Sequence, residues 1–175
     1  MLSEKRIKEA ETNVKVYLEE GLLRKSEFNT KIFSILRKNA QESLNVANFL
    51  YTNKKPGLWI IVTSYYSMFY IANALLYKLG YKVGEKIAHK VTADALIVLA
   101  RNKLKQSLLE SYEDIRNEAL ATMKSDELIE YLDFERKKRS FIQYNTPEEV
   151  KLSKVETSLK RAKEFMLQIE KLLEE

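Results

Sequence analysis

The sequence predicts an all-α protein, an antiparallel up-and-down bundle of four to six helices, and three observations support that prediction. The 175 residues include only four glycines and two prolines, so few positions favour tight turns or interrupt a helix. Apolar side chains recur at three- and four-residue steps through most of the chain, which is the spacing of one helical face. Residues 57–77 contain no charged residue, and such a stretch is typical of a helix at the centre of a bundle.

The first half of the chain is expected to form three helices. Residues 3–20 form the first, and Gly21 would end it because glycine readily adopts the left-handed conformation at a helix C-terminus. The second is expected from about residue 26 to residue 52. Pro56 and Gly57 then mark the clearest turn, since both disfavour a helix interior. The central helix follows them and is expected to end near Gly80.

The second half is expected to add three more helices. A fourth includes residues 87–99, and a fifth covers about residues 105–139. Thr146 and Glu149 form a capping-box pattern at the start of the last helix, with Pro147 in its first turn. The last helix carries one apolar stripe, which is expected to pack on a neighbouring helix, either within the chain or across a dimer. The stripe consists of Leu152, Val155, Leu159, Ala162, Met166, Ile169 and Leu173.

The uncharged run at residues 57–77 is also long enough to span a membrane, so that interpretation has to be compared with a buried helix. Polar groups such as those of Ser64 and Asn73 lie within it and would need hydrogen-bond partners in hydrocarbon. We therefore expect the central helix of a soluble bundle and no membrane association. Its second face carries Tyr66, Tyr70 and Tyr77, so it is not a plain solvent-exposed face.

The composition excludes several classes of site. There is no cysteine and only one histidine, so disulfides, thiolate metal ligands and a cysteine nucleophile are excluded, and no metal site is expected. The glycines are too far apart for a phosphate-binding loop, and no cofactor is expected. The first ten residues do not resemble a signal peptide, so we expect a cytoplasmic protein. The net charge of +5 suits RNA, DNA or an acidic partner, but also an ordinary solvated helix surface.

The most basic segment of the chain runs from Arg136 to Arg139 and is followed by Tyr144 and Asn145. One interpretation is that these cations complement the dipole at the C-terminal end of the fifth helix. A second is that an arginine interleaved with aromatic residues holds a phosphate and stacks a base. Residue types alone leave both interpretations open.

Several stretches together resemble the HEPN domains, a family named for nucleotide binding in higher eukaryotes and prokaryotes. The most specific is the central Ser-Tyr-Tyr-Ser-Met-Phe-Tyr run followed by Leu-Gly-Tyr at residues 79–81. Residues 40–50, 88–90 and 139–144 and the closing helix are similar to family motifs in the same order, so the resemblance covers about residues 36–174. It implies an antiparallel helical bundle, commonly a homodimer.

The resemblance also suggests where a site would lie. In active HEPN members, an arginine followed four to six residues later by a histidine forms a metal-independent RNase site shared by two subunits. Arg139 matches that arginine, whereas Tyr144 and Asn145 occupy the positions of the histidine. Tyr70 replaces a histidine that is frequent in the central helix. The general acid–base is therefore absent from the motif, and tyrosine, with a pKa near ~10, is a poor substitute.

His89 has two interpretations. It could face Arg139 from an adjacent helix and act as the acid–base of an endoribonuclease, so Arg139 and His89 are the candidate catalytic pair. Alternatively, it is a structural hydrogen-bonding group at the start of a helix. The predicted ligand-binding residues are Arg136, Arg139, Tyr144 and Asn145.

Three functions follow as predictions. The first is a non-catalytic HEPN-like module that binds a nucleotide, RNA or a partner protein, and that acts with a small nucleotidyltransferase in a toxin–antitoxin or regulatory pair. The second is an RNase with a degenerate active site, and the third is a structural helical dimer. A homodimer is expected because the last-helix stripe and Tyr66, Tyr70 and Tyr77 offer more apolar surface than one bundle should bury. One helical domain is expected over residues 1–175, with an N-terminal extension at 1–25 and the bundle at 26–174.

Overall fold

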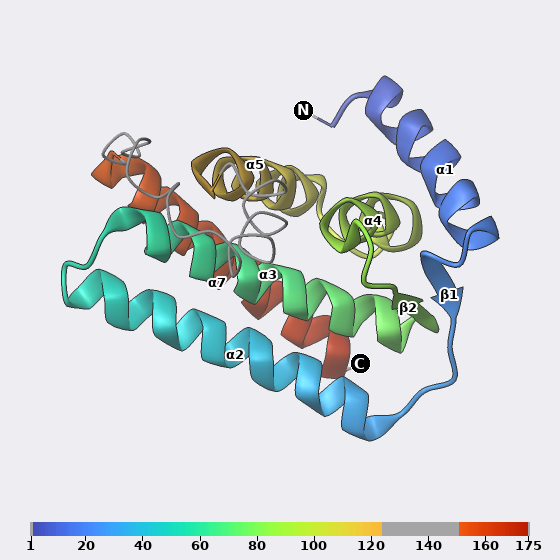
Figure 1. The fold of residues 1–175 in the computed structure, drawn as a ribbon, viewed down its shortest axis with the longest axis horizontal. Helices are drawn as coiled ribbons and strands as arrows, with labels where there is room; N and C mark the ends of the chain where they lie inside the picture. Colours follow the sequence, from blue (N-terminus) through green and yellow to red (C-terminus); the bar gives the residue numbers. More distant parts are fainter. Residues whose placement is uncertain (1, 124–150, 175) are drawn as a thin grey trace, which may run out of the picture.

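The computed structural model of the chain describes residues 2–123 and 151–174, and the fold is all-α apart from one short antiparallel ribbon (Figure 1). Strand β1 (Leu23–Lys25) pairs with β2 (Tyr81–Val83), with Leu23 opposite Val83. The predicted all-α class and antiparallel bundle are confirmed. The helices are α1 (Glu4–Glu19), α2 (Thr30–Thr52), α3 (Gly57–Lys78), α4 (Ala88–Ala95), the π-helical segment η1 (Leu96–Ala100) that continues it, α5 (Gln106–Met123) and α7 (Leu152–Glu174).

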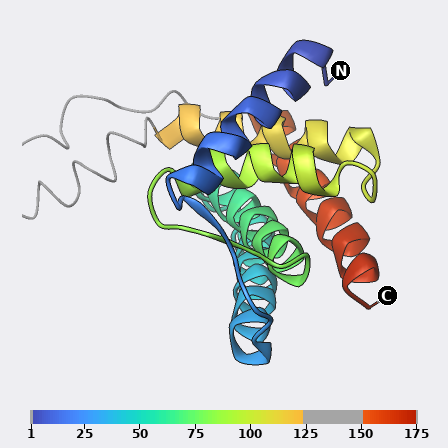
Figure 2. The same ribbon diagram turned by 90° about the vertical axis from the view of Figure 1, so that its right-hand side faces the viewer.

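Helix α3 lies at the centre of the protein. It packs along α2, which runs antiparallel to it, and is also covered by α7 and α5 (Figure 1). Figure 2 shows α1, α4 and α5 lying across α2 and α3 at a steep angle, so that α3 is covered from several directions. The prediction of a central helix is confirmed. Among the described helices, α3 alone has the length and composition to cross a membrane, but 61% of its most apolar window is buried within the protein.

The apolar stripe of the last helix packs inside the chain. Six of its seven members are buried, whereas Leu152 is exposed, and α7 has its main contact with α3. Tyr77 is also buried, and its hydroxyl donates to the carbonyl oxygen of Glu27 at 3.0 Å. The intrachain alternative is therefore the one observed. Neither the stripe nor Tyr77 supplies the unburied surface on which the expectation of a homodimer was based.

The second helix begins later than predicted. Residues 23–25 form β1, and α2 starts only at Thr30. Asn29 caps α2 because its side-chain oxygen accepts from the backbone N–H groups of Lys31 and Ile32 at 3.0 and 3.2 Å. Ahead of it, the N–H of Ser26 donates to the carbonyl of Gly80 at 2.9 Å, which continues the ribbon pairing. Pairing with a distant segment thus replaces the expected first turn of the helix.

The remaining boundaries are confirmed only in part. Helix α3 ends at Lys78, and Gly80 follows with a φ of +87°, the left-handed conformation that glycine adopts without strain. Helix α5 is described as far as Met123, so its predicted extension to residue 139 lies outside the described residues. The predicted cap Thr146 also lies outside them, and α7 begins at Leu152.

Candidate functional site

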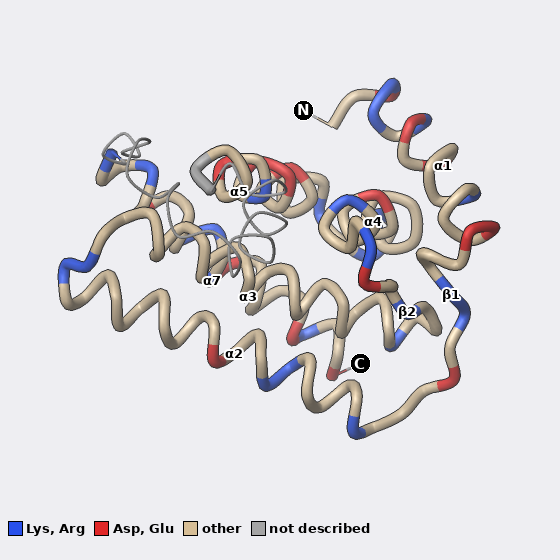
Figure 3. The backbone as a smooth tube through the Cα atoms, viewed as in Figure 1, with Lys and Arg blue, Asp and Glu red and all other residues tan. Residues whose placement is uncertain are grey.

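Four predicted ligand-binding residues, Arg136, Arg139, Tyr144 and Asn145, lie outside the described residues and stay predictions. The remaining candidate, His89, is the second residue of α4. It packs against α3, which has no charged residue before its last position (Figure 3). Of the predicted site residues, His89 therefore lies within the described part of the chain.

His89 is half-buried in a group of aromatic rings contributed by α3. Its ring centroid lies 4.5 Å from that of Phe69, 5.4 Å from Tyr65 and 5.8 Å from Tyr66. The hydroxyl of Tyr65 is 2.8 Å from Nδ1 of His89. Burial raises the pKa of Tyr65 far above its ordinary value, so at neutral pH the phenol keeps its proton and shares a hydrogen bond with Nδ1 of His89. Tyr65 therefore fixes the orientation of the ring.

The backbone immediately before His89 adopts an unusual conformation. Ile87, the N-cap position of α4, has a φ of +45° and a ψ of +32°, in the left-handed region. A β-branched residue rarely occupies this region, because its Cβ crowds the backbone there. Such strain is found more often at functional sites than elsewhere, and it here accompanies the chain's single histidine.

The aromatic group continues from Tyr65 to α5. Tyr112 packs against Tyr65 with ring centroids 6.0 Å apart, and both side chains are almost fully buried. Burial raises the pKa of both phenols, and the positive charge of Arg116, one turn further along α5, opposes that increase in each case. His89, Tyr65, Tyr112 and Arg116 thus form one continuous group, which we call the His89–Arg116 cluster.

Arg116 is the charged member of this cluster. Its Nη2 donates to the side-chain oxygen of Asn117 at 3.1 Å. Its Nε and Nη1 are buried without a hydrogen-bond partner, and the Tyr112 hydroxyl is buried beside that of Tyr65. The cluster therefore combines an imidazole with buried N–H and O–H donors, and such donors suit an anion.

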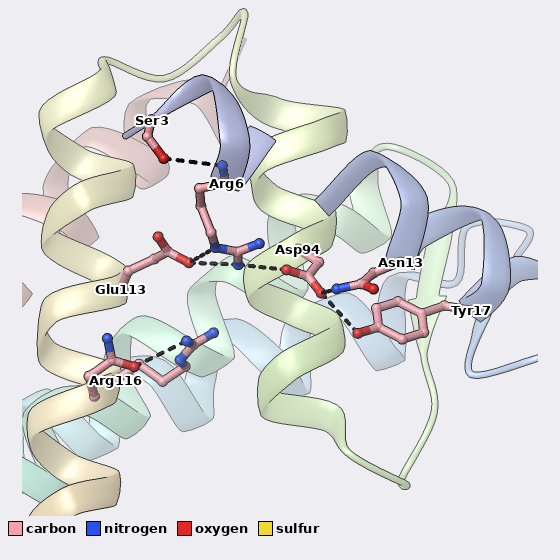
Figure 4. Close-up of polar contacts among 8 residues, drawn as sticks. Ser3, Arg6, Asn13, Tyr17, Asp94, Glu113 and Arg116 are labelled. Carbon is pink, nitrogen blue, oxygen red and sulfur yellow. Dashed lines mark hydrogen bonds and ion pairs between the residues drawn. The ribbon is translucent and has the colours of Figure 1, made fainter. Parts of the chain in front are cut away.

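A second polar group joins α1 to α4 and α5 (Figure 4). At its centre is Asp94, whose side chain is fully buried. Oδ1 of Asp94 accepts from Nη2 of Arg6 at 2.6 Å, while Oδ2 accepts from Asn13 at 2.9 Å and from the Tyr17 hydroxyl at 2.8 Å. Nε of Arg6 also donates to Glu113 at 2.8 Å. Because both oxygens of Asp94 are engaged by protein donors, this group holds α1 in place rather than binding a ligand.

Carboxylates and the imidazole do not gather into a metal site in the described part of the chain. Within residues 2–123 and 151–174, no group of three or more His, Cys, Asp or Glu residues could hold a metal ion. The His89–Arg116 cluster offers hydrogen-bonding groups, aromatic ring faces and one imidazole.

Tyr112 and Arg116 are not among the site residues predicted from the sequence. Tyr112 belongs to the apolar face of α5, where an aromatic residue is ordinarily a core residue. The available signal was the spacing, since Arg116 follows Tyr112 by four positions and so lies on the same side of the helix. An arginine beside an apolar stripe is common, and only the packing of the neighbouring Tyr112 against Tyr65 distinguishes this one.

The fold and this cluster define a helical bundle whose central helix carries a tyrosine-rich polar group. The family model described as HEPN domain matches residues 33–172, so the chain belongs to the HEPN family, as its motifs indicated. Helix α1 and strand β1 precede the matched region. No curated protein and no solved structure matches the chain.

Proposed function

We propose that this HEPN protein is a module that binds RNA or a nucleotide without cleaving it, and that His89 and the aromatic rings around it contribute to the binding surface. The observation that carries the proposal is the position of His89, half-buried against Phe69 and held at Nδ1 by Tyr65. Ring faces of this kind stack on unpaired bases, and the net charge of +5 favours a polyanion.

The absence of cleavage is proposed from the residues that RNA hydrolysis needs. Proton transfer near neutral pH is normally carried by a group with a matched pKa, most often histidine. His89 is the one histidine in the sequence, and Tyr144 and Asn145 stand where the family motif has another. A single imidazole with Tyr65 at one ring nitrogen is a poor substitute for that arrangement.

The test is binding of a labelled single-stranded RNA measured by fluorescence anisotropy over a salt series, with AMP as a competitor. The logarithm of the affinity should fall linearly with the logarithm of the salt concentration. His89→Ala should weaken binding roughly 5- to 100-fold, the effect of losing one stacking contact of about 1–3 kcal/mol. Lys38→Ala is the control, since Lys38 is an exposed residue of α2 paired with Glu42. Unchanged affinity in His89→Ala, or no salt-dependent binding, would refute the proposal.

A second candidate is an endoribonuclease in which His89 acts with Arg139. The contact between Tyr65 and Nδ1 favours it, because this hydrogen bond fixes the orientation of the one imidazole in the sequence. Incubation with RNA, followed by gel analysis of the products, separates the two functions. Cleavage that is lost in both His89→Ala and Arg139→Ala would replace the binding module by this enzyme.

The proposed protein partner follows from the family resemblance. We propose that the chain acts in the cytoplasm with a small nucleotidyltransferase, as one member of a toxin–antitoxin or regulatory pair. Co-purification of such an enzyme from native extract at stoichiometric yield would support this. Its absence from the purified complex at physiological salt would count against it.

A homodimer is proposed on a surface different from the one first expected. Ile35, Val46 and Phe49 of α2 are exposed, with 47%, 45% and 61% of their surfaces accessible. At 100° per residue they lie within about 60° of one another around the helix, so they form one outward stripe. Light scattering should give twice the chain mass of 20.5 kDa for the native protein. Phe49→Lys should shift that mass toward the monomer, and a native monomer at micromolar concentration would exclude the dimer.

A further inference from the structure

Arg116 carries a positive charge whose buried hydrogen-bond donors have no partner. Its Nε and Nη1 are shielded from solvent, and Nη2 makes its hydrogen bond with a neutral group, the amide oxygen of Asn117. Burying a charged donor without a partner is unfavourable, and buried charges are ordinarily paired. A bound anion would therefore supply the missing partner for the buried donors of Arg116.

The acidic residues that could neutralise Arg116 are already engaged. Glu113 precedes Arg116 by one helical turn, but Oε1 of Glu113 accepts from Nε and Nη2 of Arg6 at 2.8 and 2.6 Å. Asp94 of α4 is satisfied at both oxygens by Arg6, Asn13 and Tyr17. Helix α1 thus engages both oxygens of Asp94 and one oxygen of Glu113, and Arg116 has no ion pair with an acidic residue among the described residues.

A second donor accompanies the guanidinium. The hydroxyl of Tyr112 is buried beside that of Tyr65, and the hydrogen bond with Tyr65 and the charge of Arg116 both lower the pKa of that phenol against the effect of burial. The Arg116 side chain projects from α5 toward α4, below the Arg6–Asp94 ion pair (Figure 4). Arg116 as a whole is only half-buried, so solvent reaches part of the side chain.

We propose that Arg116 and Tyr112 form a phosphate-binding site on the side of α5 that faces α3 and α4. The planar guanidinium offers several N–H groups in a fixed geometry that matches a phosphate, and the phenol adds an O–H donor. The phosphate would belong to a nucleotide, to an RNA backbone or to the inorganic ion, since all three present the same oxygens. This site does not require base stacking on His89, so it goes beyond the binding module proposed above.

The experiment measures binding of inorganic phosphate, AMP and a short RNA to the full chain by calorimetry, at matched ionic strength in chloride buffer. Arg116→Gln should weaken phosphate binding at least tenfold, and Tyr112→Phe should weaken it severalfold. Arg116→Lys retains the charge but not the planar set of N–H donors. It should therefore bind phosphate more weakly than the native protein and more tightly than Arg116→Gln. Arg161→Gln is the control, because Arg161 belongs to α7 and is paired with Asp114 at 3.1 Å on the α5–α7 side.

Circular dichroism of each variant first establishes that it is folded. If Arg116→Gln does not fold, Arg116→Lys and Tyr112→Phe still test the proposal. Equal phosphate affinity in the native protein, Arg116→Lys and Tyr112→Phe would overturn the proposal, as would a native protein that binds none of the three ligands. RNA binding that is insensitive to Arg116 but lost in His89→Ala would refute this site and leave the proposed function standing. Phosphate binding through Arg116 without RNA or AMP binding would support this site and refute the proposed function.

Discussion

Asp94 and Arg6 form an ion pair of 2.6 Å between α4 and α1, although 88 positions separate them in the sequence. The Asp94 side chain is fully buried, whereas that of Arg6 retains 21% of its exposure. The carboxylate also accepts from Asn13 and Tyr17, so three side chains of α1 converge on one residue of the bundle. This arrangement attaches the segment that precedes the matched HEPN region.

Substitution of Asp94 by asparagine should destabilise the protein strongly. Arg6 would lose a buried anionic partner, and breaking one side of a buried pair typically costs about 3–5 kcal/mol. Urea unfolding followed by circular dichroism measures the change. Glu11→Gln is the matched control, because the Glu11–Arg101 pair joins α1 to the bundle with side chains 42% and 38% exposed. The control should cost less than about 1 kcal/mol. Equal effects of the two substitutions would contradict the special role of Asp94.

Stability should fall as the pH rises above about 10, the ordinary pKa of tyrosine. Burial raises the pKa of Tyr65 and Tyr112, so the folded protein keeps both protons while the unfolded chain loses them. The stabilisation is complete below the unfolded pKa and is lost as the pH rises, by about 1.4 kcal/mol per pH unit for each phenol. Tyr112→Phe removes one phenol, so its unfolding free energy should depend less steeply on alkaline pH. Equal alkaline slopes in urea titrations of both proteins would disprove the assignment.

Removal of Arg6 should weaken phosphate binding at Arg116, although Arg6 lies on a different helix. Arg6→Ala releases Glu113, which lies three positions before Arg116 on α5 and can then pair with it. An ion pair with a partly exposed carboxylate contributes about 1 kcal/mol, and competition of that size would lower the affinity for phosphate roughly fivefold. Arg6→Ala combined with Glu113→Gln should restore the affinity. A double variant as weak as the single one would show that α1 acts by some other route.

Enlarging an alanine at the α2–α3 contact should destabilise the bundle. Ala47 is fully buried on α2, and α2 has its most extensive contact with α3. Ala47→Leu adds three carbon atoms to a filled space, which typically costs about 1–3 kcal/mol. Ala121→Leu is the control on an exposed position of α5 and should change stability by less than about 0.5 kcal/mol. Thermal unfolding compares the two, and a harmless Ala47→Leu would mean that the contact is loosely packed.

Much of the fold could be predicted from the sequence, because a helical face is defined by apolar residues three or four positions apart. The central position of residues 57–77, the stop at Gly21 and the family all follow from residues close together in the chain. The ribbon of β1 and β2 could not be predicted, since each strand has three residues and exists only through the other. The later start of α2 follows from that pairing.

The candidate site was less accessible to sequence analysis. His89 could be singled out as the one histidine in the sequence. Its hydrogen-bond partner Tyr65 lies 24 positions earlier, in a helix that was predicted to form the core of the bundle. Arg116 resembles any arginine beside an apolar stripe until its Nε and Nη1 are seen to be buried without partners. Its importance depends on where Glu113 and Arg6 lie, and no local pattern contains that information.

The sequence by itself determined which segments are helical, which helix is central and to which family the chain belongs, because periodicity and motif spacing are properties of neighbouring residues. Only the tertiary structure decided which charges are paired, which phenols are buried and which arginine nitrogens are buried without a hydrogen-bond partner. The physical reason is that desolvation and hydrogen-bond geometry arise when distant segments pack, as Arg6 and Asp94 do between α1 and α4.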